Sequence, residues 1–411
     1  MGATESGNRV FFDQLEALRG IAAMTVLVFH VIASVPVKTT AIDDLGLVGG
    51  IFSFLLPALF NGSGAVTLFF VLSGFVLGCN VDAARAITVS GYTGFIVRRL
   101  FRIIPALWAS VLLAMLLNRQ IHGLHYSAYQ TFNFLFLQDT SINGPLWSIQ
   151  VELLASIIYP FLLYASRSLG LLFNLTLLLV LISFSLGETP FPMRYVWCFH
   201  LGILVPTLGR WLMTMLPRQL HVPLLIIAFV AFAAATQFAR VEYLNPKKSI
   251  QIEGWAAFYL IAFVLYSGSS IKNSILDARP ARWLGRISYS LYVLHFPIDS
   301  MVISKFSGYF GSAFTTHYPF VQLLALPFVV GISLALADLS YRFVEKPFHG
   351  YGRPAARWIT EQLSDIGPLI VTRKSQAALR RYDATTLVMV ASTVGGAIVF
   401  CYMVFTAALR F

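Results

Sequence analysis

Long apolar segments separated by short polar ones follow one another along almost the whole chain. A helix needs about 20 mostly apolar residues to cross the hydrocarbon core of a bilayer. Lipid offers no partner to backbone N–H and C=O groups, so segments of this kind must be helical. The pattern therefore predicts an all-α polytopic membrane protein, with a bundle of about ten transmembrane helices and an additional C-terminal one. The expected spans are 15–35, 62–80, 103–118, 146–165, 170–187, 195–209, 222–239, 254–268, 287–304, 319–341 and 386–408.

Composition agrees with a membrane protein and excludes an ordinary soluble domain. Hydrophobic residues make up 57% of the 411 residues and charged residues only 11%, against ~45–50% and ~25% in soluble domains. The connections are short except for 36–61, 119–145 and 344–384. We therefore expect one membrane domain over 1–348, a cytoplasmic amphipathic linker over 349–385 and the last transmembrane helix within 386–411.

The basic residues indicate the orientation of the chain. A net charge of +11 would suggest nucleic acid as the partner of a soluble protein, but in a membrane protein Lys and Arg mark the cytoplasmic loops. Of the 29 Lys and Arg residues, 20 fall in one alternate set of loops and 8 in the other, while Arg19 lies inside the first span. This asymmetry predicts a multi-pass protein of the cytoplasmic (inner) membrane with a cytoplasmic N-terminus and no nucleic-acid partner.

The expected linker contains apolar residues at helical spacing among charged ones. Trp358, Ile359, Leu363 and Ile366 share one helical face. An amphipathic helix at the cytoplasmic membrane surface is one interpretation, and a solvated linker is the other.

The three cysteines are most simply inert thiols. Cys79, Cys198 and Cys401 all fall within expected spans and lack the spacing of a metal or redox site. We expect no metal cofactor.

A charge inside a span is costly, so an ionisable residue there is a functional candidate. The four candidates singled out are Arg19, His30, Glu152 and His295. Arg19 and His30 share the first span and, eleven positions apart, lie within about 20° of one helical face and roughly 16 Å apart along its axis. Snorkelling of Arg19 to lipid phosphates and a structural role for the His30 imidazole are the simpler alternatives. For His295, which follows Tyr289 and Tyr292 at helical spacing, a neutral core histidine is the simpler interpretation.

Glu152 and His30 are expected at a similar depth near the outer face. A carboxylate that orients an imidazole and stabilises its protonated form is the pairing used in general base catalysis. A structural His–Glu pair between two helices would give the same pattern. Ser148, just before Glu152, is expected to cap the helix that carries Glu152, although it could also donate a hydrogen bond in the site.

A second set of candidates lies near the cytoplasmic surface. Arg98, Arg99 and Arg102 directly precede an expected span, and guanidinium groups bind phosphates through paired hydrogen bonds. Positive-inside topology alone also explains basic residues there. Ser73 and Gly74, deep in the second span, allow close helix packing or leave room for a bound chain.

Together these residues resemble the membrane-bound O-acyltransferases of acyltransferase family 3. The resemblance runs from about Phe12 to Phe348, and each motif falls in the family's order. The first matching motif is Arg19 and His30 with ten residues between them. The others are the stretch from Phe69 to Phe75, Arg99 with Arg102 before Ile103 and Pro105, Trp147-Ser148 with Glu152, the stretch from Ser288 to His295, and Tyr341 to Pro347. Some members carry a further extracytoplasmic domain; since this chain stops at Phe411, we expect none here.

The resemblance implies transfer of an acyl group, with acetyl the default, from cytoplasmic acyl-CoA to a hydroxyl of an extracytoplasmic polysaccharide or lipid-linked glycan. His30, Glu152 and Arg19 would be catalytic, while Arg98, Arg99, Arg102 and Ser73 would bind the acetyl-CoA. His30 would act as general base or carry the acyl group itself. The alternative is a transporter or flippase of a lipid-linked sugar, in which Arg19, His30 and Glu152 form a proton-coupled pathway.

Overall fold

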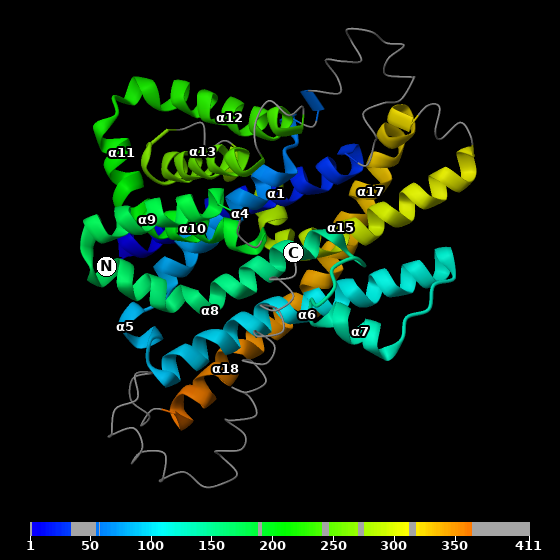
Figure 1. Ribbon diagram of the computed structural model, residues 1–411, viewed down its shortest axis with the longest axis horizontal. Helices are drawn as coiled ribbons and strands as arrows, with labels where there is room; N and C mark the ends of the chain where they lie inside the picture. Colours follow the sequence, from blue (N-terminus) through cyan, green and yellow to red (C-terminus); the bar gives the residue numbers. More distant parts are fainter. Residues whose placement is uncertain are drawn as a thin grey trace. The chain divides into compact units, whose positions relative to one another are not determined.

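The computed structural model describes residues 2–33, 55–56, 58–187, 191–240, 246–269, 275–311 and 318–363. Within these ranges all the regular elements are helices and no β-strand occurs (Figure 1). Eight helical stretches in the described part are long and apolar enough to cross a membrane. The predicted all-α, multi-pass membrane fold is therefore confirmed.

The surface of these helices is what a lipid environment requires. Large apolar side chains project outward from α9 (Gly170–Leu186) and α12 (Arg218–Arg240); Leu172 is 80% exposed, and Leu179 and Ile227 are also exposed. Contiguous apolar surface of this extent is rare on soluble monomers. These two helices thus present their apolar faces to lipid.

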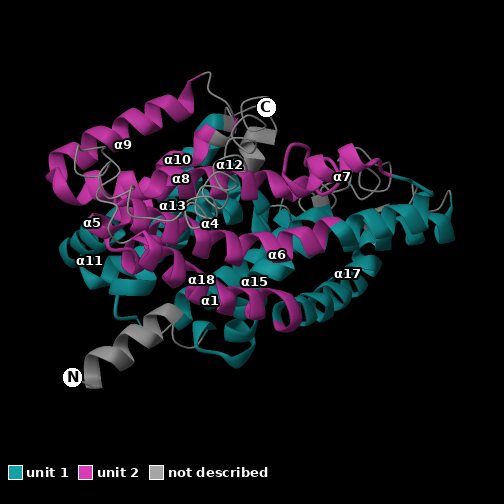
Figure 2. Ribbon diagram, turned by 90° about the horizontal axis from the view of Figure 1, so that it is seen from below, with its two compact units in different colours: residues 1–73, 112–125, 204–341 teal, residues 74–111, 126–203, 342–411 magenta. Residues whose placement is uncertain are grey.

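The chain divides into two compact units, coloured separately in Figure 2. Unit 1 comprises residues 1–73, 112–125 and 204–341, and unit 2 comprises residues 74–111, 126–203 and 342–411. The two long helices α4 (Gly62–Asn80) and α6 (Val89–His122) contribute residues to both units.

Unit 1 is built around the first helix. Its elements, besides α12, are α1 (Gly2–Ala33), the π-helix Val205–Gly209, α11 (Arg210–Met215), α13 (Pro246–Tyr266), α15 (Arg279–Phe310) and α17 (Tyr318–Ser340). Among them α1 packs against α15 and α17, α15 packs against α17, and α12 packs against α13.

Unit 2 is built around α8 (Trp147–Ser168), which contacts α5 (Ala83–Ala86) and α9. Tyr159 and Leu163 of α8 are fully buried in an apolar cluster with Phe95 and Ile96 of α6. Its elements beyond those above are α7 (Ala128–Leu135), a 3-10 turn at Gly144–Leu146, a second at Phe191–Tyr195, α10 (Val196–Leu204), a π-helix at Tyr341–Glu345 and α18 (Lys346–Gln362).

Most expected spans coincide with observed helices. The span predicted at 62–80 has the bounds of α4, and that at 146–165 lies within the helical stretch Gly144–Ser168. The span predicted at 195–209 continues to Met215 but loses its regular helix at Val205–Gly209, where Pro206 lacks the N–H that an α-helical turn needs. The span predicted at 386–408 lies outside the described residues.

Candidate functional site

His30 of α1 lies beside His295 of α15 in unit 1. His295 Nε2 is 3.3 Å from His30 Nδ1, and the two ring centroids are 5.0 Å apart. His30 Nδ1 is also 2.9 Å from the carbonyl oxygen of Val26, one turn earlier in the same helix. His295 is fully buried, and its Nδ1 lies 2.6 Å from the carbonyl oxygen of Tyr292.

These contacts select one tautomer for each neutral imidazole. A backbone carbonyl only accepts hydrogen bonds, so His295 Nδ1 carries a proton toward Tyr292 and its Nε2 carries the lone pair. His30 Nδ1 faces both that lone pair and the Val26 carbonyl, and it must therefore be protonated as well. The lone pair of His30 is then on Nε2, the nitrogen that can accept a proton from a reacting group.

The sequence suggested a core histidine at position 295, and His295 is indeed fully buried. Its Nδ1 faces the backbone carbonyl of Tyr292, and its other nitrogen faces His30. The two histidines are 265 positions apart in the chain, so no local pattern could have paired them.

Two glycines bring α1 and α15 together. A Cβ at Gly20 would collide with the backbone of Gly285, and a Cβ at Gly285 would collide with the backbone of Glu16. Small residues allow this close approach of two membrane helices. Gly20 meets Gly285 and, ten residues further along both helices, His30 meets His295, so α1 and α15 run parallel.

The surroundings of the histidine pair are aromatic. His30 makes edge-on contacts with Phe29 and Phe296, with ring centroids 5.4 and 5.5 Å apart. Phe69 of α4 lies edge-on to Tyr292. An apolar wall of this kind excludes water and strengthens the polar contacts inside it.

Glu152 is held in unit 2 by Arg99. Arg99 Nη2 donates to Glu152 Oε1 at 2.6 Å, and Arg99 Nε donates to Ser156 Oγ at 3.1 Å. The Arg99 side chain is only 7% exposed and that of Glu152 18%. A charge-assisted bond this short is among the stronger polar contacts in proteins, so Arg99 stabilises Glu152 as a carboxylate. The predicted pairing of Glu152 with His30 stays a prediction.

Ser148 does not cap its helix, contrary to expectation. The helix α8 already begins at Trp147, its N-cap is Leu146 without a side-chain bond, and Ser148 Oγ donates to the Pro145 carbonyl at 3.0 Å. The preceding 3-10 turn supplies the first hydrogen bonds of this helix instead. Trp147 packs on the rings of Phe191 and Tyr195.

The three arginines predicted to bind the donor point to different places. Arg98 is exposed and lines a pocket of unit 2, whereas Arg99 is buried against Glu152. Arg102 is half-buried and does not line that pocket. Arg98 and Arg102 are four positions apart and share a helical face, from which Arg99 is turned by about 100°.

The remaining predicted site residues, Arg19 and Ser73, belong to unit 1. Arg19 is partly exposed on α1 next to the glycine of the helix crossing, and Ser73 is half-buried on α4. Their roles stay predictions.

Sequence reasoning missed two buried carboxylates. Glu253 of α13 is fully buried; its Oε1 accepts from Asn61, and its Oε2 accepts from Ser63 and Thr67, at 3.1–3.2 Å. Asp299, only 4% exposed, lies one helical turn after His295 on α15. Asp299 falls inside an expected span and Glu253 directly precedes one. The cost of placing a charge in the membrane is therefore the signal that could have found both.

The fold and this histidine-centred site define a class of multi-pass membrane protein, and comparison with known sequences gives its family. The profile of a family described as an acyltransferase domain matches residues 12–341, and the chain belongs to this family. This is the family that the motifs resemble.

Individual relatives are more distant. The chain is 28% identical over 337 residues to a Bacillus subtilis protein named "Putative peptidoglycan O-acetyltransferase YrhL", covering 71% of this chain and 51% of the relative. It is 27% identical over 122 residues to the O-acetyltransferase OatA of Staphylococcus aureus, covering 29% of this chain and 18% of that protein. The chain thus spans about half the length of the first relative and a smaller share of the second. No solved structure matches it.

Proposed function

We propose that this protein is an O-acyltransferase that moves an acyl group, acetyl by default, from cytoplasmic acyl-CoA to a hydroxyl of an extracytoplasmic glycan. The proposed acceptor is a polysaccharide or a lipid-linked glycan. The name of one relative specifies peptidoglycan, and the names of both specify O-acetyl transfer. The proposal places the protein in the cytoplasmic membrane with its N-terminus inside.

The observation that carries the proposal is the pair of contacts at His30 Nδ1. The Val26 carbonyl lies 2.9 Å and His295 Nε2 3.3 Å from this nitrogen, which puts the lone pair of the neutral ring on Nε2. Fixing an imidazole in this way is what general base catalysis on a hydroxyl requires. Membership of an acyltransferase family over residues 12–341 supplies the reaction class.

The reaction follows from these groups. As the acceptor oxygen attacks the thioester carbonyl, His30 Nε2 takes the hydroxyl proton. The C–S bond then breaks, and the imidazolium returns the proton to the leaving thiolate. In the alternative route His30 Nε2 attacks the carbonyl itself, and the C–S bond breaks to release the CoA thiolate. The acceptor oxygen then takes the acyl group from Nε2, and its proton passes to the thiolate. His295 is a positioning residue in both routes, because it acts through His30.

The other predicted residues have supporting roles in the proposal. Glu152, kept ionised by Arg99, would bind the acceptor or stabilise the imidazolium. Arg98 and Arg102 would meet the phosphates of the donor, Arg19 would line its path, and Ser73 would leave room for its pantetheine chain. Arg99 contributes indirectly, through Glu152.

The test is acetyl transfer by the purified protein in nanodiscs. Labelled acetyl-CoA is supplied with a panel of glycan acceptors that includes peptidoglycan fragments, capsule-type polysaccharide and lipid-linked oligosaccharide. His30→Gln should lower kcat by about 10²–10⁴-fold, the usual contribution of a general base. The matched control is His122→Gln, since His122 is an exposed histidine at the end of α6; it should retain the wild-type rate.

The form of the labelled product separates the outcomes. Label on glycan alone indicates direct transfer, and label on protein when glycan is omitted indicates an acyl-enzyme. Movement of a lipid-linked sugar across the bilayer without label on any product would support the transporter instead. Equal rates for His30→Gln and wild type would refute the proposed role of His30.

A further inference from the structure

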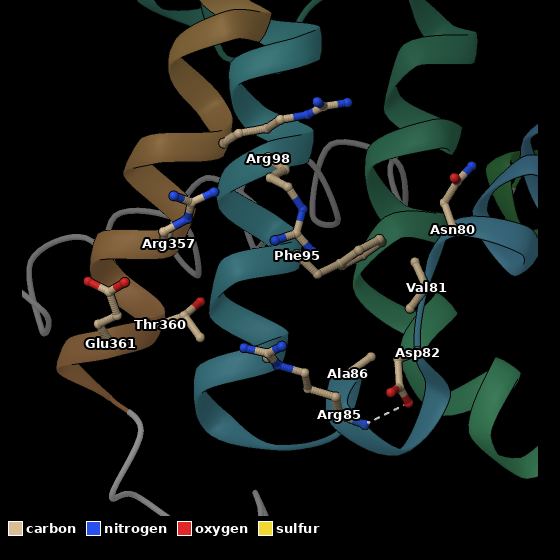
Figure 3. Close-up of a pocket in the computed structure, with 12 residues that line it drawn as sticks. Asn80, Val81, Asp82, Arg85, Ala86, Phe95, Arg98, Arg357, Thr360 and Glu361 are labelled. Carbon is tan, nitrogen blue, oxygen red and sulfur yellow. Dashed lines mark hydrogen bonds between the residues drawn. The ribbon is translucent and has the colours of Figure 1, made fainter.

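Unit 2 contains a pocket in which arginines from three helices meet (Figure 3). Its volume is about 470 Å³, within the range of roughly 300–1,000 Å³ typical of small-molecule sites. Arg85 comes from α5, Arg98 from α6, and Arg353 and Arg357 from α18. Only Arg98 among them had been predicted to bind a ligand.

Close packing of α18 on α6 forms one wall of this pocket. A Cβ at Gly94 would lie 2.5 Å from Thr360 Oγ1, and one at Gly352 would lie 2.8 Å from Phe101 Cβ. Ala356 and Ile359 of α18 are buried against Val97 of α6. The described part of this amphipathic segment is thus a helix that packs within unit 2.

The spacing along α18 directs its charges to one side. Arg353, Arg357 and Glu361 are four positions apart, and residues at this spacing share a helical face. All three line the pocket, while Ile359 lies on the buried face.

The pocket has an excess of positive charge. Four arginines face two carboxylates, which leaves two net positive charges. One of the carboxylates, Asp82, already accepts the backbone N–H groups of Ala84 and Arg85 at 3.1 and 3.2 Å as the cap of α5. Guanidinium groups gathered around one cavity repel each other unless an anion occupies it.

We propose that this pocket binds the phosphate groups of a nucleotide, namely the 3′-phosphate and diphosphate of the acyl-CoA donor; this inference rests on the proposed function. Guanidinium forks bind phosphate oxygens through paired hydrogen bonds. Val81, which is half-buried, adds an apolar side chain beside the arginines, which suits the ring of a base. A lipid headgroup offers the same phosphate chemistry but no ring for that side chain.

The experiment measures ligand binding to the full chain in nanodiscs of phosphatidylcholine, which has no net charge. Affinities for CoA and for dephospho-CoA, which lacks the 3′-phosphate, are compared by thermophoresis. Arg353→Gln and Arg357→Gln should each weaken CoA binding about tenfold or more, the usual effect of losing one charge-assisted hydrogen bond. Wild type should bind CoA more tightly than dephospho-CoA, and one of the variants should lose this preference.

Three comparisons make the result decisive. Arg218→Gln removes an exposed arginine of α12 that is not among the residues lining the pocket, and this variant should bind CoA as wild type does. Arg357→Lys should recover part of the affinity, because the charge remains but the fork does not. Equal thermal unfolding midpoints for all variants show that the fold is kept, as expected for exposed side chains.

The outcomes separate this inference from the proposed function. Wild-type CoA affinity in both glutamine variants would overturn it, even if acetyl transfer were observed. Pocket-dependent CoA binding without any transfer would support it and count against the proposed reaction. Loss of phosphatidylglycerol association in the variants, with CoA affinity unchanged, would overturn it in favour of a lipid headgroup.

Discussion

The crossing of α1 and α15 can be tested by replacing Gly20 with alanine. The added Cβ would lie 2.7 Å from Leu284 Cβ and still closer to the backbone of Leu284 and Gly285. The nearest backbone atom, Gly285 N, would lie at 2.4 Å, whereas ordinary contact begins at 3.4 Å; a backbone cannot rotate away, so α15 must retreat by about 1.0 Å. If the helices separate as rigid bodies, the distance from His295 Nε2 to His30 Nδ1 grows from 3.3 Å to about 4.3 Å, beyond a hydrogen bond.

Two opposing terms set the change in stability. Overpacking of a close contact costs about 1–3 kcal/mol, and replacing a helical glycine by alanine returns about 1 kcal/mol through helix propensity. We expect a net loss of up to about 2 kcal/mol in the free energy of unfolding. Because a displacement of ~1 Å at reacting groups can cost about 100-fold in rate, kcat should fall by about 10–100-fold.

Gly331→Ala is the matched control, since nothing lies within 4 Å of a Cβ at this position of α17. It should unfold at the wild-type temperature or slightly above and transfer acetyl at the wild-type rate. Thermal unfolding followed by circular dichroism in detergent, together with the acetyl-transfer assay, measures both effects. If Gly20→Ala matches Gly331→Ala in both measurements, the close crossing does not hold the histidine pair.

Three further predictions concern the polar contacts. Replacing His295 with methionine should lower kcat about 2–10-fold with KM unchanged, which is the value of one hydrogen bond. His295→Gln keeps an acceptor and should recover part of the loss. A change in KM alone would contradict a positioning role. Arg99→Met should destabilise the protein by about 3 kcal/mol, the lower end of the cost of breaking a buried pair, because it leaves the partly buried Glu152 carboxylate without its cation. Adding Glu152→Gln should restore thermal stability, and no recovery in the double variant would contradict this account. Glu253→Leu should lower the unfolding midpoint more than Glu253→Gln, because each buried donor left without an acceptor costs about 1–3 kcal/mol; the reverse order would contradict it.

The helices could be predicted because their cause is local. Apolar segments of the length needed to cross a bilayer lead directly to α4, α8 and α12, and the breaks follow local chemistry such as Pro206. His30 could also be singled out as a candidate, since ionisable residues inside a span are functional candidates. The helical period of the first span placed Arg19 and His30 on nearly one face.

The partners of these residues could not be predicted, because partners depend on which helices pack together. The structure places His295 beside His30 and Arg99 beside Glu152, and neither contact follows from depth along the membrane. Depth suggested a pairing of Glu152 with His30, which stays a prediction. Periodicity gives the face of a helix but not the helix that covers it. The same limit applies to the basic pocket, where Arg98 meets Arg353 and Arg357 from a segment about 250 residues further along the chain.

Glu253 has a consequence for how the protein is made. A helix that enters the membrane with a carboxylate meets a penalty of a few kcal/mol at the translocon, and here the three neutral donors that offset it lie on or just before α4. Since α4 is synthesised long before α13, its donors are already in the bilayer when α13 arrives. The order of the chain therefore supplies the donors for Glu253 before α13 is made, and we expect the membrane insertion of α13 to depend on the earlier insertion of α4.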